Sequence, residues 1–118
     1  MAGKVIERTA WAYPASPADR WSGEWEGGPD GAGISVIFNH TEAVGGGPRL
    51  HSHPYPETFI IRKGRARFTV GSEVFEAVEG QIVVAPAGVP HKFENAGPGP
   101  LENIDIHEAG LFETTWLE

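Results

Sequence analysis

The most informative part of the sequence for the fold is residues 45–64, GGGPRLHSHPYPETFIIRKG. His51 and His53 are separated by one residue, so in a strand both imidazoles point to the same face. Glu57 follows across the turn Pro54-Tyr55-Pro56, and its even spacing keeps it on that face where the strand resumes. The stretch therefore predicts two imidazoles and one carboxylate that converge on one point.

A third histidine joins this group from a different part of the chain. His91 precedes Lys92-Phe93-Glu94 in a later predicted strand, and two adjacent strands can deliver all four side chains to one site. Three imidazoles and one carboxylate are good ligands for a divalent transition metal. We predict one such ion, and these ligands suit Fe, Mn, Ni, Zn and Cu alike. An isolated His-x-His pair is more often two ordinary polar strand residues, so the prediction depends on the spacing along the whole chain.

Glycine and proline are frequent, with 16 and 10 copies among 118 residues. Both residues break helices, which excludes a helical bundle. They suit short strands joined by tight turns, and a chain of this length forms one domain. We therefore predict an all-β sandwich or barrel. The predicted strands span residues 33–38, 58–62, 66–70, 73–78, 82–85, 91–94, 101–107 and 113–117.

The charge and the cysteine content exclude several classes of function. Nine basic and 16 acidic residues give a net charge of -7, which repels nucleic-acid phosphates and offers no polybasic patch to anionic lipid. The lack of cysteine excludes thiol nucleophiles, disulfides, iron–sulfur clusters and cysteine zinc sites. No apolar run approaches the ~18 residues of a membrane span, and residues 1–8 lack the apolar segment of a signal peptide. We predict a cytoplasmic protein that binds neither nucleic acid nor membrane.

The N-terminal region, residues 1–32, is predicted to form an edge strand and an ordered arm that precede the barrel domain at residues 33–118. The edge strand is expected at residues 4–8. Residues 9–32 are interrupted by proline and glycine but contain three of the four tryptophans, whereas disordered tails are poor in aromatic residues. The arm is therefore expected to pack either in a groove of its own chain or on a partner subunit.

The spacings of histidine, glycine and proline resemble the two motifs of the cupin superfamily. The first motif is Gly, five residues, His-x-His, three or four residues, Glu, six residues, Gly. The second is Gly, five residues, Pro-x-Gly, two residues, His, three residues, Asn. Both motifs are intact, as in small single-domain cupins. The matching positions are Gly45, His51, His53, Glu57 and Gly64 in the first motif and Gly80, Pro86, Gly88, His91 and Asn95 in the second.

The resemblance implies a jelly-roll type of β-barrel that encloses a metal ion. Carried over position by position, the ligands would be His51, His53, Glu57 and His91. The family's known activities imply a metal-binding protein that binds or acts on a small organic oxygen-donor ligand, with dioxygenase or isomerase chemistry. The alternative is a non-catalytic binding barrel or a structural barrel. Small cupins of this type are commonly homodimers, which implies a homodimer here.

The alternation of the strands suggests which side chains surround the ion. Phe59, Ile61, Phe68 and Phe93 are expected to face inward and line an apolar ligand pocket, although small barrels also fill their interior with such side chains. His107 shares one strand face with Asn103 and Asp105. It lines the pocket if Ile104 and Ile106 face outward, and it lies outside if they face inward.

Overall fold

Ten β-strands and two short helical turns make up the computed structural model, which describes residues 3–118. All predicted strands after residue 32 are present, and the predicted bounds of the strands at 82–85 and 101–107 are exact to the residue. The strands are β1 (Gly23–Glu26), β2 (Ser35–Thr41), β3 (His51–Ser52), β4 (Glu57–Lys63), β5 (Arg65–Val70), β6 (Glu73–Val78), β7 (Ile82–Ala85), β8 (His91–Asn95), β9 (Leu101–His107) and β10 (Thr115–Trp116); the helical turns are α1 (Arg8–Trp11) and η1 (Gly28–Asp30).

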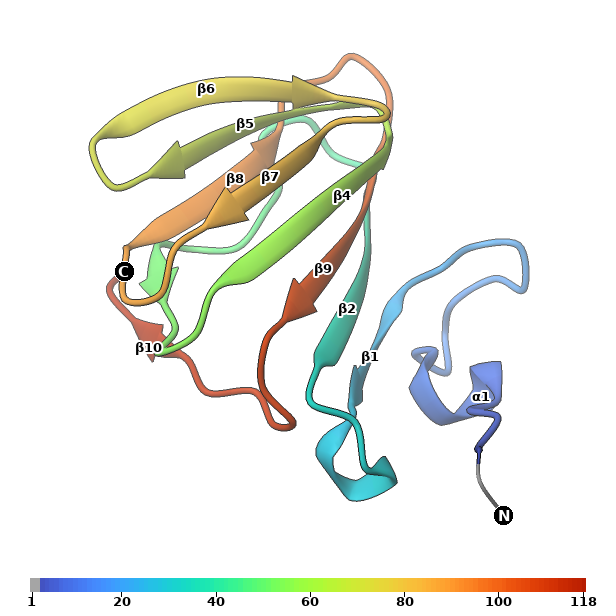
Figure 1. The fold of residues 1–118 in the computed structure, drawn as a ribbon. Helices are drawn as coiled ribbons and strands as arrows, with labels where there is room; N and C mark the ends of the chain where they lie inside the picture. Colours follow the sequence, from blue (N-terminus) through green and yellow to red (C-terminus); the bar gives the residue numbers. More distant parts are fainter. Residues whose placement is uncertain (1–2) are drawn as a thin grey trace.

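The strands form two five-stranded antiparallel sheets that enclose the interior of a barrel (Figure 1). One sheet has the order β1-β2-β9-β4-β7, and the other has the order β10-β3-β8-β5-β6. From β2 to β10, the chain passes from one sheet to the other at every connection except the one between β5 and β6. This crossing pattern confirms the predicted all-β barrel of jelly-roll type.

The core lies between the two sheets because each strand alternates buried and exposed side chains. In β9 the odd positions from Leu101 to His107 are buried, whereas the even positions are half-buried. In β4, Glu57, Phe59 and Ile61 are buried by the same alternation. The apolar core consists of Phe59, Ile61, Ala66, Phe68, Ala77, Val83, Ala85, Phe93 and Leu101.

Two residues of the motifs, Gly64 and Asn95, have a structural role in the turns of the barrel. Gly64 joins β4 to β5 with a φ of +87°, and a Cβ there would lie 2.4 Å from the carbonyl oxygen of Pro100. Asn95 donates its side-chain N–H groups to the carbonyl oxygens of Thr41 and Gly99, and its side-chain oxygen accepts from Gly97 N–H. These contacts fix the turn after β4 and the loop between β8 and β9.

The predicted edge strand at residues 4–8 is wrong. Residues 3–7 form no strand, and the chain instead makes the helical turn α1. Val5 is 81% exposed, so no sheet or core was available to cover a strand at this position. The edge of the first sheet is β1, which lies inside the region expected to be an irregular arm and pairs with β2.

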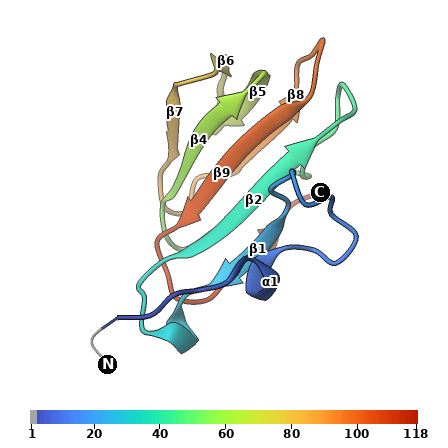
Figure 2. The same cartoon turned by 90° about the vertical axis from the view of Figure 1, so that its right-hand side faces the viewer.

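The arm packs on its own chain, against the outer face of the first sheet (Figure 2). The ring centroids of Trp11 and Phe38 are 4.1 Å apart, and Trp21 lies 5.5 Å from the same phenylalanine. The guanidinium of Arg62 lies over the ring of Trp21, 5.2 Å from its centroid, so the arm contacts both β2 and β4.

The predicted homodimer stays a prediction. Within residues 3–118, no helix has the length and the hydropathy that crossing a membrane requires.

Candidate metal centre

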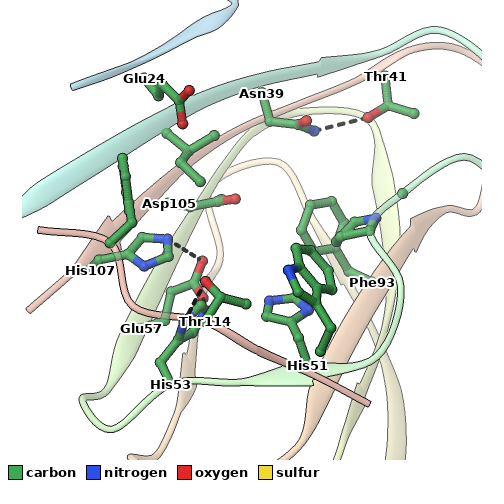
Figure 3. A pocket seen from close by; sticks show the side chains of 15 residues that line it. Glu24, Asn39, Thr41, His51, His53, Glu57, Phe93, Asp105, His107 and Thr114 are labelled. Atoms are coloured by element: carbon green, nitrogen blue, oxygen red, sulfur yellow. Dashed lines mark hydrogen bonds and ion pairs between the residues drawn. The ribbon is translucent and has the colours of Figure 1, made fainter. Parts of the chain in front are cut away.

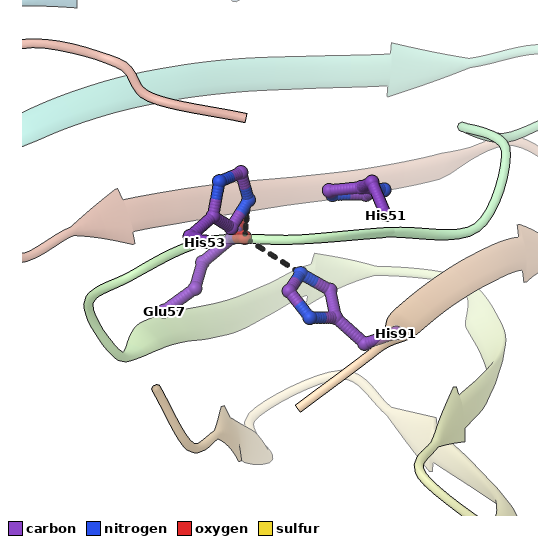
Figure 4. A group of neighbouring side chains, drawn as sticks. All are labelled: His51, His53, Glu57 and His91. Carbon is purple, nitrogen blue, oxygen red and sulfur yellow. Dashed lines mark hydrogen bonds and ion pairs between the residues drawn. The ribbon is translucent and has the colours of Figure 1, made fainter. Parts of the chain in front are cut away.

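The four predicted ligands come together between the sheets (Figure 4). His51 lies in β3, opposite His91 at the start of β8, and His53 follows β3 directly. Glu57 begins β4 in the other sheet. One ligand atom from each of the four residues lies within 4.8 Å of the other three, and all four side chains are buried.

The turn between β3 and β4 brings residues of both sheets to the same point. It carries the chain from His53 in one layer to Glu57 in the other, across Pro54-Tyr55-Pro56. The carbonyl oxygen of His53 accepts the N–H of Gly88 at 2.7 Å, which ties this turn to the loop that precedes His91. The two motifs therefore meet through the main chain as well as through their side chains.

The three histidines share one hydrogen-bond pattern. Each donates its Nδ1–H to a main-chain carbonyl oxygen: His51 to Arg49 at 2.6 Å, His53 to Glu113 at 2.8 Å and His91 to Val89 at 3.0 Å. A carbonyl oxygen only accepts, so each Nδ1 carries the proton and a neutral ring keeps its lone pair on Nε2. A neutral imidazole held in this way presents Nε2 to a metal.

Glu57 faces two of these nitrogens at close range. Its Oε1 atom lies 3.0 Å from Nε2 of His53 and 3.0 Å from Nε2 of His91. Nε2 of His53 is buried and completes no hydrogen bond. Lone pairs facing a carboxylate oxygen repel each other unless a proton or a cation lies among them. The buried group of three histidines and one glutamate therefore fits a divalent metal ion.

The surroundings shift the pKa values of these ligands in different directions. Burial alone would raise the pKa of Glu57, but its close contacts with His107, His53 and His91 outweigh this effect and hold that pKa well below its ordinary value. Burial lowers the pKa of His51, which favours the neutral ring. Burial also opposes the charged form of His53, but its contacts with Glu57 and with the Glu113 carbonyl raise the pKa overall.

His107 lies inside the barrel, and Ile104 and Ile106 lie on the other face of β9. It stands opposite Glu57 across β4 and β9, with its Nε2 atom 3.2 Å from Oε2 of Glu57. Its Nδ1 atom lies 2.7 Å from the hydroxyl of Tyr55. His107 therefore contacts the predicted centre from outside the group of four ligands.

A pocket of about 450 Å³ opens beside this group and is bordered by His51, His53 and Glu57 (Figure 3). Of the five residues predicted to line it, Phe93 and His107 do so. Phe59, Ile61 and Phe68 do not border this pocket and lie within the apolar core. They point inward as predicted, but at their level the barrel is filled with side chains and leaves no space for a ligand.

Asp105 lines the pocket beside His107. Asp105 is buried on the same face as His107, and Asn103 donates a hydrogen bond to it. Burial, and then the charge of Glu57, raise the pKa of Asp105 well above its ordinary value. Only the alternation of residues 101–107 indicated these positions. The lining residues that the sequence did not indicate are Glu24, Ile37, Asn39, Thr41, Gly47, Pro48, Phe112, Thr114 and Trp116.

The family model described as Cupin domain matches residues 39–107, which include all four ligand candidates. A stretch of 43 residues is 42% identical to an uncharacterized protein of Streptomyces coelicolor, covering 36% of this chain and 41% of that protein. The chain thus spans less than half the length of the curated relatives it matches.

Solved structures share the architecture. An uncharacterized conserved protein from Klebsiella pneumoniae, with a double-stranded β-helix domain, matches with 98% of each chain covered, 21% identity and a TM-score of 0.72. Bacillus subtilis oxalate decarboxylase matches with a TM-score of 0.73 and 23% identity, over 80% of this chain and 27% of that one. At these identities the likeness establishes a common fold.

Proposed function

The chain belongs to the cupin family, and from this premise we propose that it holds one divalent transition metal and binds a small anionic organic molecule, a carboxylate or an enolate, beside that ion. The observation that carries the proposal is the shared orientation of His51, His53 and His91. Their Nδ1 atoms are tied to main-chain carbonyls, which leaves three Nε2 lone pairs directed at one point next to Glu57.

The charge of the ligand set favours an anion. Three neutral imidazoles contribute no charge, and Glu57 contributes one negative charge, so a divalent ion would keep a net positive charge. The chain's net charge of -7 opposes an anion at long range. Exposed charges are screened beyond ~8 Å at physiological salt, so the local charge dominates inside the barrel.

The pocket supports an organic ligand of modest size. Its volume of about 450 Å³ lies within the usual range for small-molecule sites. Its lining combines apolar side chains of Ile37, Phe93 and Phe112 with polar groups of Asn39 and Asp105. Such a pocket argues against a purely structural barrel, whose interior would be filled by its own side chains.

A divalent ion in this place supplies Lewis acidity toward a bound oxygen donor or, with a redox-active metal, oxidative chemistry. The protein's own residues hold the ligand and exclude water. The buried histidines fix one side of the pocket, Asn39 offers an amide, and the raised pKa of Asp105 favours its neutral acid, which can donate a hydrogen bond. These groups would orient an anion whose oxygen faces Glu57 and the histidines.

The test is a calorimetric titration of small carboxylates, oxalate included, into the Mn(II)-loaded protein. Oxalate is chosen because the Bacillus subtilis fold relative is an oxalate decarboxylase. We expect binding to the wild type and to His40→Ala, whose ring lies against Glu42 and Glu102 away from the pocket. We expect no binding to His51→Ala. Equal binding by His51→Ala, or no binding by any form, would overturn the proposal.

A second measurement distinguishes catalysis from binding alone. The Fe(II)-loaded protein is incubated with each carboxylate that binds, and oxygen uptake and product formation are followed. Turnover that is lost in His51→Ala identifies an enzyme. Binding without turnover identifies a protein that holds its ligand unchanged.

A further inference from the structure

Three buried side chains form a continuous line that the four-ligand group does not explain. The hydroxyl of Tyr55 lies 2.7 Å from Nδ1 of His107, and Nε2 of the same ring lies 3.2 Å from Oε2 of Glu57. Tyr55, His107 and Glu57 are 8%, 2% and 3% exposed. Figure 3 shows the His107 ring turned toward the carboxylate of Glu57. The line therefore ends on the oxygen of Glu57 that does not contact His53 or His91.

The proton positions along this line follow from the partners of Tyr55. Its hydroxyl oxygen accepts the main-chain N–H of Glu113 at 3.2 Å. Among residues 3–118, the acceptor in reach of the hydroxyl proton is Nδ1 of His107. A neutral His107 then carries its proton on Nε2, which faces Glu57. This is the opposite tautomer to the one that main-chain carbonyls impose on the three ligand histidines.

We infer that Tyr55 and His107 are a positioning pair that holds Glu57 as a one-oxygen ligand. The Nε2–H of His107 faces Oε2 at 3.2 Å, so Oε1 is the atom left facing His53 and His91. This inference rests on the proposed function, because it concerns how the chain presents Glu57 to an ion. It assigns His107 a role outside the ligand set, since its proton occupies the nitrogen that would otherwise bind metal.

The packing around His107 keeps its ring in this orientation. His107 pairs in register with Glu57 across β9 and β4, so the two side chains are neighbours on the same face. Phe112 meets the ring edge-on, with centroids 4.9 Å apart, and His53 lies 4.7 Å away on another side. Rotation of the ring would break the contact with Tyr55. The hydroxyl of Tyr55 is thus the group that selects the tautomer.

A double-mutant cycle with Tyr55→Phe and His107→Gln tests the inference. Glutamine places an amide N–H close to the position of the imidazole Nε2–H, and an amide needs no partner to select its tautomer. The readouts are the Mn(II) dissociation constant and the fine structure of the Mn(II) EPR spectrum, which reports the ligand geometry. We expect Tyr55→Phe alone to weaken Mn(II) binding about 10–100-fold and to change the spectrum.

In the His107→Gln background, we expect Tyr55→Phe to cause no further loss and no spectral change. A merely structural tyrosine would act equally in both backgrounds, because Glu113 N–H loses its acceptor in each. Equal losses would therefore overturn the inference. If Tyr55→Phe fails to fold, His107→Gln is compared with His107→Leu, which lacks a donor. Retained affinity in the first and loss in the second support the inference, and equal affinities overturn it.

The same experiment separates this inference from the proposed function. His40→Gln is the matched control, because it makes the same chemical change on a histidine outside the pocket. A wild type that does not bind Mn(II) at all overturns both proposals. A wild type that binds Mn(II) through His51, but shows equal losses in the cycle, overturns the positioning role alone.

Discussion

The indole of Trp116 lies against the imidazole of His51, with ring centroids 5.0 Å apart. The two residues are paired in register between β10 and β3, and the guanidinium of Arg49 lies 5.1 Å from the same indole. Main-chain N–H of Leu117 donates to the carbonyl oxygen of Leu50, which extends this pairing. The last strand of the chain thus forms one wall of the pocket and touches a predicted metal ligand.

This contact makes Trp116 a reporter of metal binding. We expect Co(II), which is paramagnetic, to quench the fluorescence of Trp116 because quenching of this kind acts at short range. In Trp116→Phe the Co(II)-dependent quenching should be lost while Co(II) still binds. The measurement is a fluorescence titration alongside metal analysis of each protein.

Trp21→Phe is the control, because Trp21 packs on the outer face of the first sheet, against Phe38 and Arg62. It should reduce total emission but leave the Co(II)-dependent quenching in place. Quenching that survives in Trp116→Phe and disappears in Trp21→Phe would contradict the placement of the metal beside His51.

Substitutions of the two kinds of ligand should differ in severity. His91→Ala removes one of the three imidazoles that face Glu57, so we expect a protein purified without bound metal. Glu57→Gln keeps an oxygen donor of similar shape, so metal retention should weaken modestly. The check is metal per chain by elemental analysis after dialysis, with His40→Ala expected to match the wild type.

The grouping of the four ligand candidates was predictable because most of their relations are local in the sequence or set by short turns. His51 and His53 share a face through the alternation of a strand, and Glu57 follows after a single turn. His91 required more, because its place opposite His51 depends on strand pairing between distant segments. The second motif supplied that relation, which no local pattern contains.

The pocket was less predictable because alternation shows which face points inward but does not show depth. Phe59 and Phe93 both face the interior and belong to the core, yet only Phe93 also borders the pocket. Which face of β9 points inward could not be predicted, because it depends on what covers the opposite face. In the structure the arm covers that opposite face, where Trp21 packs across the sheet.

Asp105 should make the stability of the metal-free protein depend on pH. Burial raises its pKa in the folded state, so the wild type loses stability as pH rises above the ordinary aspartate pKa of about 3.9. Asp105→Asn does not titrate and avoids this loss. We expect the variant's advantage in free energy of unfolding to grow with pH until the folded-state pKa is passed.

Urea unfolding in EDTA at a series of pH values measures this difference. Asp19→Asn is the matched control, because the same substitution is made at an exposed position in the arm. Its difference from the wild type, measured at each pH, is the baseline against which Asp105→Asn is compared. An Asp105→Asn difference that stays constant across the series would show that the buried carboxyl is not held in its neutral form.

Phe68 should stabilise the barrel without contributing to ligand binding. It is fully buried, packs between Phe59 at 5.0 Å and Phe93 at 5.5 Å, and does not line the pocket. Phe68→Ala should lower the free energy of unfolding by about 3–5 kcal/mol, because it removes a buried ring and leaves a cavity. Val74→Ala, at a residue that is 63% exposed, should change the free energy of unfolding by less than about 0.5 kcal/mol.

Folded Phe68→Ala should keep the wild-type metal content and carboxylate affinity. A changed carboxylate affinity with unchanged stability would instead place Phe68 in the binding site.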